Sequence, residues 1–287
     1  MSGFEQRLIE VGGCRVGLFE AGPPGAPLAL FAHCSLAFAG LWKGVMAELA
    51  DRWRCVAIDM PGHGRSDRGD RSISLQHQAL AYVEGAAAEA GGGPAHLVGL
   101  SLGGAVMGRV AAKRSDLTRS LTLIEPVYFH LLTDADGAEN EENARAMTPV
   151  YQACAEGRFH DGARLFMEAW GQPGQFDRMP GPARDAVARA LSFLAEDFHM
   201  VSGWPEGQVT PEALSAIAAP VLLMQGERTQ GSAKAILDAL QRLQPGAERR
   251  EVAGAGHLSP VDDPKAVAGL LADFFGRAER VRNRRAD

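Results

Sequence analysis

Residues 95–103, Ala95-His96-Leu97-Val98-Gly99-Leu100-Ser101-Leu102-Gly103, contain the stretch that decides the fold. The apolar residues up to Val98 predict a buried strand, and the small residues of 103–113 predict a helix. Between them, residues 99–103 fit the pattern G-x-S-x-G. A strand that turns sharply into a helix forces the middle residue into a strained conformation, and the flanking glycines avoid clashes. Ser101 then stands at a helix N-terminus, where free N–H groups favour developing negative charge, so it is a candidate nucleophile rather than an inert turn residue.

Strand and helix patterns alternate on both sides of this stretch. Apolar runs predict strands at Cys14–Glu20, Leu28–Ala32, Arg54–Ile58, Ser120–Ile124, Val221–Gln225 and Arg249–Val252. Helical spacing predicts helices at Leu41–Ala50, Leu75–Ala90, Ser232–Leu243 and Pro264–Arg277. This alternation predicts an α/β fold with a mostly parallel, doubly wound sheet.

The alternation stops after Pro126. The next 80 or so residues show helical patterns at Glu139–Met147, Tyr151–Glu156, Asp161–Trp170 and Pro182–Phe198, and no convincing buried strand. We therefore predict that residues 1–126 and 211–287 form one α/β core and that residues 127–210 form a helical cap inserted after the strand Ser120–Ile124.

Composition excludes several classes of protein. The 287 residues are 46% hydrophobic and carry a net charge of −6, which gives no electrostatic signature of nucleic-acid binding. No apolar run is long enough to cross a membrane, and residues 1–7 lack the pattern of a signal peptide. The four cysteines show no metal-binding or disulfide spacing. We expect a cytoplasmic protein that needs no metal or organic cofactor and binds a small-molecule substrate, without nucleic acid or membrane as partner; homo-oligomerisation is left open.

A serine nucleophile needs a base, and the base needs an orienting acid. His257 lies in a glycine-rich loop, Gly254-Ala255-Gly256-His257, between the last predicted strand and the last helix. Loops that follow parallel strands lie at one edge of the sheet, so His257 is expected on the same side as Ser101. We interpret His257 as the base rather than a solvated loop histidine.

These features resemble the α/β-hydrolase family, and the resemblance covers nearly the whole chain. Phe31-Ala32-His33-Cys34-Ser35 is similar to the family's loop after strand 3, and residues 59–67, DMPGHGRSD, are similar to its loop after strand 4. The resemblance implies an oxyanion hole made by the backbone N–H groups of Leu102 and Ser35. Cys34 replaces the usual glycine there, and we interpret it as a small wall residue rather than a second nucleophile. Asp59 and His63 are expected to brace their loop.

The triad acid departs from the usual pattern of the family. Members commonly carry it as G-x-x-D after strand 7, but here Gly226-Glu227-Arg228-Thr229 places a threonine at that position. Glu125 follows the strand beside that of the nucleophile, where a buried carboxylate is costly unless it is paired. We predict that Glu125 is the acid, with Glu227 as the alternative.

The resemblance implies a serine hydrolase that cleaves a small to medium apolar carboxylic ester through an acyl-enzyme. The alternatives are a C–C bond hydrolase of dienoic ketone acids and an inactive ligand-binding protein. Basic residues of the cap facing the pocket would favour the former; the candidates are Arg145, Arg158 and Arg164. The apolar residues of the cap that we expect to line the pocket, or else to form the cap's own core, are Phe129, Leu131, Phe166, Trp170, Phe193, Phe198 and Trp204.

Overall fold

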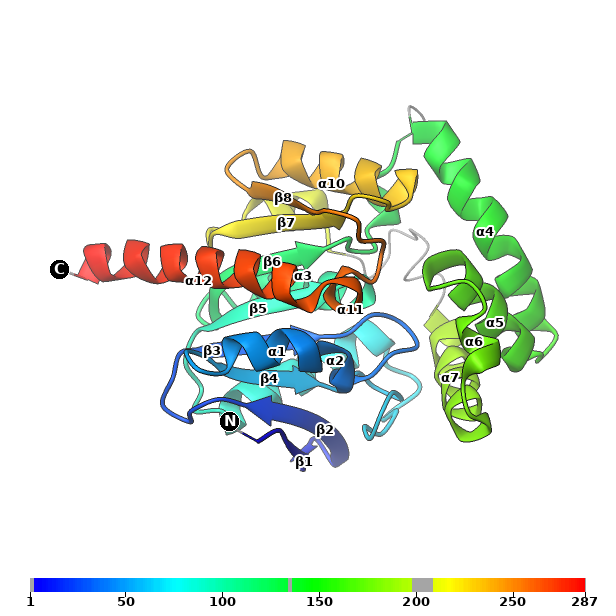
Figure 1. The fold of residues 1–287 in the computed structure, drawn as a ribbon, viewed down its shortest axis with the longest axis horizontal. Helices are drawn as coiled ribbons and strands as arrows, with labels where there is room; N and C mark the ends of the chain where they lie inside the picture. The colour runs from blue at the N-terminus through cyan, green and yellow to red at the C-terminus, as the bar shows by residue number, and fades with distance from the viewer. Residues whose placement is uncertain (1–2, 134–135, 198–208, 287) are drawn as a thin grey trace.

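An eight-stranded sheet forms the centre of the protein in the computed structural model, which describes residues 3–133, 136–197 and 209–286 (Figure 1). The strands lie in the order β1-β2-β4-β3-β5-β6-β7-β8. Strands β3 to β8 are parallel, and β2 pairs antiparallel with β1 and β4. Their bounds are β1 Glu5–Val11, β2 Cys14–Ala21, β3 Leu28–Ala32, β4 Arg54–Ile58, β5 Ala95–Leu100, β6 Thr118–Ile124, β7 Val221–Gly226 and β8 Glu248–Val252.

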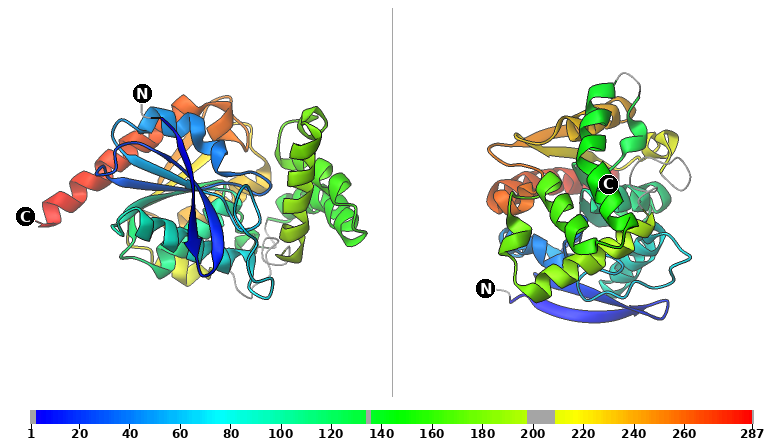
Figure 2. Two further views of the ribbon diagram at one scale, coloured as in Figure 1. Left: turned by 90° about the horizontal axis from the view of Figure 1, so that it is seen from below. Right: turned by 90° about the vertical axis from the view of Figure 1, so that its right-hand side faces the viewer.

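Helices cover both faces of this sheet (Figure 2). Alternate residues of β3 face opposite sides: Leu28 and Leu30 belong to one hydrophobic cluster, Ala29 and Phe31 to the other. The first cluster includes residues of α2 (Leu75–Glu89), α3 (Leu102–Lys113) and α10 (Gly231–Leu243). The second includes residues of α1 (Lys43–Leu49) and α12 (Pro264–Ala286). The sheet is therefore doubly wound and mostly parallel, as predicted.

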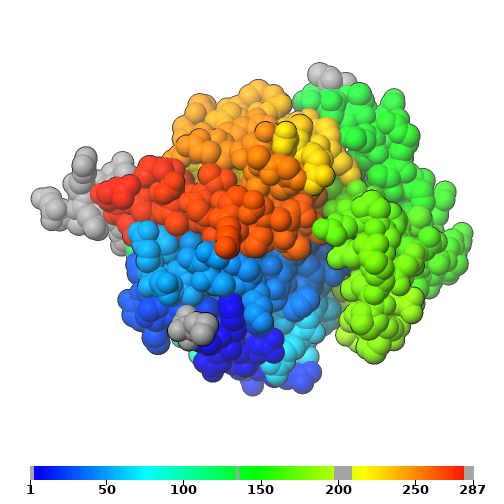
Figure 3. All heavy atoms as spheres, viewed as in Figure 1, coloured from blue at the N-terminus to red at the C-terminus, as the bar shows by residue number. Residues whose placement is uncertain are grey.

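A group of helices lies between β6 and β7 in the chain and forms a lobe at one end of the molecule (Figure 3). We call this lobe the helical insertion. Its helices are α4 (Gly137–Ala155), α5 (Phe159–Trp170), α6 (Gln175–Arg178) and α7 (Gly181–Leu194), followed by the 3-10 turn Ala195–Asp197. Gly162 of α5 lets the helices approach closely, because a Cβ there would lie 2.9 Å from Leu191 of α7 and 3.2 Å from Cys154 of α4. The division of the chain at residues 127 and 210 into a core and a cap stays a prediction.

The secondary structure differs from the prediction at four places. Strand β1 was not predicted, because it lies at the sheet edge with most of its side chains partly or fully exposed. The helix predicted at Leu41–Ala50 begins as a 3-10 turn, Ala39–Trp42, before α1. Helix α4 runs unbroken where two helices were predicted, because Pro149 lies on its exposed side. Helix α12 continues beyond Arg277 to Ala286.

Candidate active site

Ser101 occupies a tight turn between β5 and α3. Its backbone has φ 56° and ψ −116°, a region that L-residues rarely adopt, and it caps the N-terminus of α3. A Cβ on Gly99 would lie 2.2 Å from the carbonyl oxygen of Gly103, and a Cβ on Gly103 would lie 2.2 Å from that of Ala32. The two glycines of the motif are therefore required by the close approach of α3 to β5 and β3.

Glu125 follows β6 directly and holds the side chain of His257. Strand β6 pairs in parallel with β5, so the carboxyl ends of both strands lie at one edge of the sheet. The Nδ1 atom of His257 lies 2.6 Å from Oε2 of Glu125. The same carboxylate accepts hydrogen bonds from the Gly226 N–H, 2.8 Å from Oε1, and from the Thr229 hydroxyl at Oε2. A fully buried carboxylate is thus surrounded by three donors.

The charge of Glu125 determines which nitrogen of His257 carries the proton. Burial raises the pKa of the Glu125 carboxyl, but hydrogen bonds from His257, Thr229 and Gly226 outweigh it and hold this pKa below its ordinary value of 4.5. An ionised carboxylate can only accept hydrogen bonds, so the neutral imidazole must donate from Nδ1. Its Nε2 is then the atom with a free lone pair, as a general base requires.

Glu227 does not contact His257 and binds elsewhere. Its Oε2 accepts a hydrogen bond of 2.6 Å from the N–H of Gly254, in the loop that carries His257. Thr229, which stands where the family commonly has its acid, points its hydroxyl at Glu125 instead. Two carboxylates were considered as partners of His257. Glu125 is hydrogen-bonded to the imidazole, whereas Glu227 is hydrogen-bonded to the backbone of the loop that carries His257.

The loop after β3 presents the second predicted oxyanion donor and is held by two buried histidines. Nε2 of His33 accepts a hydrogen bond from the Met60 N–H at 2.9 Å, and Nδ1 of His33 lies 2.7 Å from the Cys34 carbonyl oxygen. Nε2 of His63 accepts from the N–H of Leu36 at 3.3 Å. The loop adjoining Ser35 is therefore tied at both ends to the loop after β4.

Both of these histidines are neutral at physiological pH. Burial lowers the pKa of His33 to about 4. Burial, reinforced by the nearby His33, lowers the pKa of His63 to about 3. Each accepts a backbone hydrogen bond at Nε2, which a protonated imidazole could not do. Their role in the structure is to orient backbone, and neither lines the cavity described below.

Asp59 and Cys34 complete the surroundings of this loop. Asp59 accepts hydrogen bonds from the N–H groups of Ala39, at 2.7 Å, and Arg65, at 2.8 Å, so it joins two loops. Cys34 lies on the cavity wall, and burial raises the pKa of its thiol to about 12. A thiol that stays protonated is a poor nucleophile.

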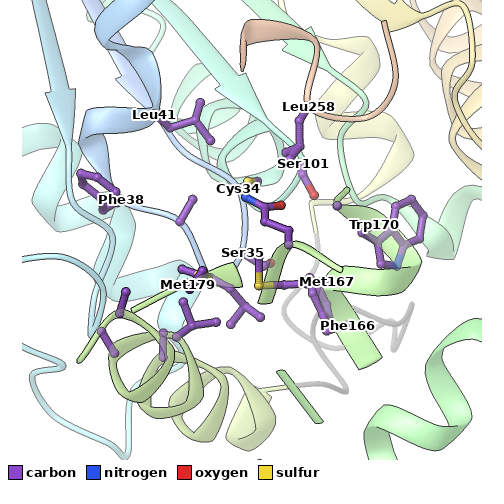
Figure 4. Close-up of a pocket in the computed structure, with 18 of the residues that line it drawn as sticks. Cys34, Ser35, Phe38, Leu41, Ser101, Phe166, Met167, Trp170, Met179 and Leu258 are labelled. Atoms are coloured by element: carbon purple, nitrogen blue, oxygen red, sulfur yellow. The ribbon is translucent and has the colours of Figure 1, made fainter. Parts of the chain in front are cut away.

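A cavity of about 390 Å³ opens beside Ser101, between the sheet edge and the helical insertion (Figure 4). Ser101, His257, Cys34 and Ser35 line its floor. The remaining walls are mainly apolar, with Phe166, Met167, Trp170, Met179 and Val187 from the insertion and Leu36, Phe38, Leu41, Leu258 and Val261 from the core. The Trp170 ring also packs against the imidazole of His257, with centroids 5.0 Å apart.

The structure describes five of the seven predicted pocket residues, and these five divide into three groups. Phe166 and Trp170 line this cavity, whereas Leu131 is buried in the main hydrophobic cluster and Phe129 packs on Trp170. Phe193 lines a second cavity. Phe198 and Trp204 lie outside the described residues.

The three arginines considered as pocket residues lie elsewhere. Arg145 pairs with Glu141 and Arg158 with Glu156 and Asp161, and neither they nor Arg164 line the cavity. The cationic side chain that does line it is Arg189, which the sequence did not single out.

The described ranges hold neither a metal-binding cluster nor a membrane-spanning helix. In residues 3–133, 136–197 and 209–286, no three His, Cys, Asp or Glu side chains are grouped so that they could hold a metal ion. In the same ranges, no helix combines the length and the apolar character needed to cross a bilayer.

The fold and the strand–turn–helix at Ser101 define a class of enzyme, and comparison with known proteins agrees with it. The family model described as "Alpha/beta hydrolase family" matches residues 29–270, so the chain belongs to the alpha/beta hydrolase family. Hydrolases and esterases are among its relatives.

Two relatives and one solved structure illustrate the similarity. The chain is 26% identical over 280 residues to the 2-(acetamidomethylene)succinate hydrolase of Mesorhizobium japonicum, covering 95% of both chains. It is 27% identical over 286 residues to the pimeloyl-[acyl-carrier protein] methyl ester esterase of Methylococcus capsulatus, covering 91% of this chain and 99% of that protein. The structure of the enol-lactonase from Burkholderia xenovorans matches with a TM-score of 0.75 at 18% identity, over 94% of this chain and all of that one, which is a likeness of fold.

Proposed function

We propose that the protein is a serine hydrolase that cleaves carboxylic esters through an acyl-enzyme. Ser101 is the nucleophile, His257 the general base and Glu125 the acid that orients it. The observation that carries this proposal is the 2.6 Å hydrogen bond between His257 Nδ1 and the ionised, buried Glu125, at the cavity that Ser101 also lines.

The chemistry follows from these positions. Nε2 of His257 takes the proton of the Ser101 hydroxyl as Oγ bonds to the ester carbonyl carbon and the carbonyl electron pair moves onto its oxygen. The N–H groups of Leu102 and Ser35 donate hydrogen bonds to that oxyanion. When the electron pair returns, the bond to the alcohol oxygen breaks, and the alcohol leaves with the proton from His257. Water repeats the sequence on the acyl-enzyme, releasing the acid and restoring Ser101.

The cavity supports an apolar substrate of small to medium size. Its volume of about 390 Å³ lies in the range of small-ligand sites, and its upper walls are aliphatic and aromatic. Carbon–carbon bond hydrolysis stays the alternative: the three arginines considered for it do not line the cavity, but Arg189 of α7 does. The pimeloyl ester esterase among the relatives is a further reason to favour an ester.

Covalent labelling tests the assignment of Ser101. A fluorophosphonate probe is expected to add one equivalent to the peptide that contains Ser101, and Ser101→Ala should lose both this label and hydrolysis of a p-nitrophenyl ester, by about 10⁴-fold or more. Ser192→Ala, which changes a half-buried serine outside the cavity, is the matched control and should behave as wild type. Stoichiometric labelling in Ser101→Ala, or no turnover of any ester by the wild type, would contradict the proposal; the latter would favour a ligand-binding protein.

A further inference from the structure

A second cavity, of about 480 Å³, adjoins the first and has a different chemical character. Gly62, Gly64 and Arg189 line both cavities. A Cβ on Gly62 would lie 2.5 Å from the ring of Phe193 and 3.3 Å from Arg68, both of which line the second cavity.

Arginines dominate the lining of this second cavity. Arg15, Arg65, Arg68 and Arg189 come from β2, the loop after β4 and helix α7, and one carboxylate, Asp67, lines the cavity with them. Asp67 is already paired with Arg15 at 2.8 Å, and Glu196 lies 3.7 Å from Arg68. The lining therefore has more positive than negative charge.

Arg65 and Arg189 are the members of this group available to a ligand. Within residues 3–133, 136–197 and 209–286, neither guanidinium has a carboxylate within 4 Å. The backbone N–H of Arg65 is bound to Asp59, which fixes the start of its side chain. A guanidinium presents paired N–H donors that match the two oxygens of a carboxylate or of a phosphate.

We propose that Arg65 and Arg189 form a subsite for an anionic oxygen group, a carboxylate or a phosphate, at the end of the substrate remote from the ester. The inference rests on the proposed function and narrows its substrate class. The apolar part of such a substrate lies in the cavity beside Ser101, and its anionic end lies at Arg189, which lines both cavities, next to Arg65 in the cationic cavity. Esters with a neutral end leave these two arginines unused.

A set of matched esters tests the subsite. We compare the mono-4-nitrophenyl ester of suberic acid, the same compound with its free acid methylated, and 4-nitrophenyl 8-phosphonooctanoate. The wild type is expected to prefer one or both charged esters over the methylated one by about tenfold to hundredfold in kcat/KM, mainly through KM. The better of the two charged esters identifies the anion. Raising the salt concentration should reduce the preference, because both arginines are exposed.

Variants attribute this preference to the two arginines. Arg189→Gln and Arg65→Gln should each lower kcat/KM for the charged ester about tenfold or more, and by a larger factor than for the methylated ester, so that the preference for the charged ester falls. Arg184→Gln, on the same helix but lining neither cavity, is the matched control and should preserve the preference. Equal kcat/KM for charged and methylated esters in the wild type, or a preference that survives in the Arg65→Gln, Arg189→Gln double variant, would overturn the proposal.

Binding to a variant that cannot turn over separates this inference from the proposed function. Calorimetry with Ser101→Ala should detect the charged suberate ester and lose that signal when Arg189→Gln is added. If the wild type hydrolyses no ester while Ser101→Ala binds the charged ester and the added Arg189→Gln change abolishes that binding, the reaction is contradicted and the subsite is not. Ester turnover with equal binding in both variants would contradict the subsite alone.

Discussion

At the scale of single residues, the position of Glu125, the proposed acid, is the feature that sets this chain apart from the family's commonest pattern. Glu125 has an unusual backbone, with φ 43°, at the end of β6, and all three of its donors come from elements after the helical insertion. The donors compensate the cost of burying its charge. The carboxylate, the threonine and the histidine thus act as one hydrogen-bonded unit.

Replacing this carboxylate by an amide gives the sharpest prediction. Glu125→Gln keeps the shape but cannot stabilise the imidazolium and can favour the wrong tautomer of His257, so kcat should fall by about 10⁴-fold with the fold intact by circular dichroism. Glu227→Gln is the matched control and should change kcat less than about tenfold, since Glu227 binds the Gly254 backbone. Both are measured at saturating ester across a range of pH. A large loss in Glu227→Gln alone would place the acid after β7 instead.

Thr229→Val tests the same hydrogen-bonded unit by removing one of the three donors to Glu125 and keeping the carboxylate itself. It removes a hydroxyl that donates to the carboxylate oxygen bound to His257, while the Gly226 N–H remains. A hydrogen bond to a charged group contributes about 1.5–3 kcal/mol. Because this hydrogen bond stabilises the ionised form of Glu125, its loss should raise the pKa of the Glu125 carboxyl. We expect the acid limb of the kcat/KM profile to move to higher pH. An unchanged profile would mean that the hydroxyl makes no contribution to the ionised acid.

At the scale of secondary-structure elements, the helical insertion provides one wall of the cavity. Phe166 on α5 faces that cavity, whereas Phe176 on α6 is buried and does not line it. Phe166→Ala should therefore enlarge the cavity and shift the ranking of p-nitrophenyl esters towards longer acyl chains. Phe176→Ala should lower the free energy of unfolding by about 3–5 kcal/mol without changing that ranking. Equal losses on every ester in Phe166→Ala would indicate a folding defect instead.

The sequence predicted the strands well where nearly all residues of a strand are buried. Strands β3, β4, β5, β6 and β7 are buried along nearly their whole length, so their apolar runs identify them to within two residues. Strand β1 has no such signal because its side chains are mostly exposed. The turn at Ser101 was predictable because its determinants are local: a serine between two glycines, directly after an apolar run.

Contacts between distant segments were predicted where strand ends meet at one edge of the sheet, as for Glu125 and His257, but not elsewhere. Thr229 was noted only as a departure from the usual acid, although a hydroxyl at that position could have been considered as a donor to Glu125. The second cavity combines residues of the first hairpin, of the 62–68 loop and of α7. Each of these segments alone looks like ordinary charged surface, and only the fold brings their arginines together.

At the scale of the whole molecule, buried histidines make stability depend on pH. In the unfolded chain a histidine takes up a proton near its ordinary pKa of 6.5, whereas His33 does so only near pH 4 and His63 only near pH 3 in the folded protein. Below pH 6.5 the unfolded state therefore binds more protons, and the free energy of unfolding must fall as the pH falls. Each group contributes up to about 1.4 kcal/mol per pH unit.

Urea denaturation at pH 7, 6 and 5 checks this dependence. His63→Gln, whose amide oxygen can still accept from Leu36, should show a shallower loss of the free energy of unfolding between pH 6 and pH 5 than the wild type. His160→Gln, which replaces a histidine 58% exposed on α5, is the control and should leave the slope unchanged. Identical slopes for His63→Gln and wild type would mean that His63 does not stay neutral in the folded protein.

The hydrogen bond from the Thr229 hydroxyl to the Glu125 carboxylate also limits which substitutions could move the acid from position 125 to position 229. An aspartate at position 229 would put a second carboxylate beside the first, and two carboxylates sharing one site cannot both be ionised. One of the two carboxyl groups would be protonated at neutral pH. Its O–H group would compete with the Nδ1–H group of His257 for the same oxygen of the other carboxylate. The two sites for a triad acid are thus mutually exclusive, and moving the charge from β6 to β7 requires that both positions be exchanged together.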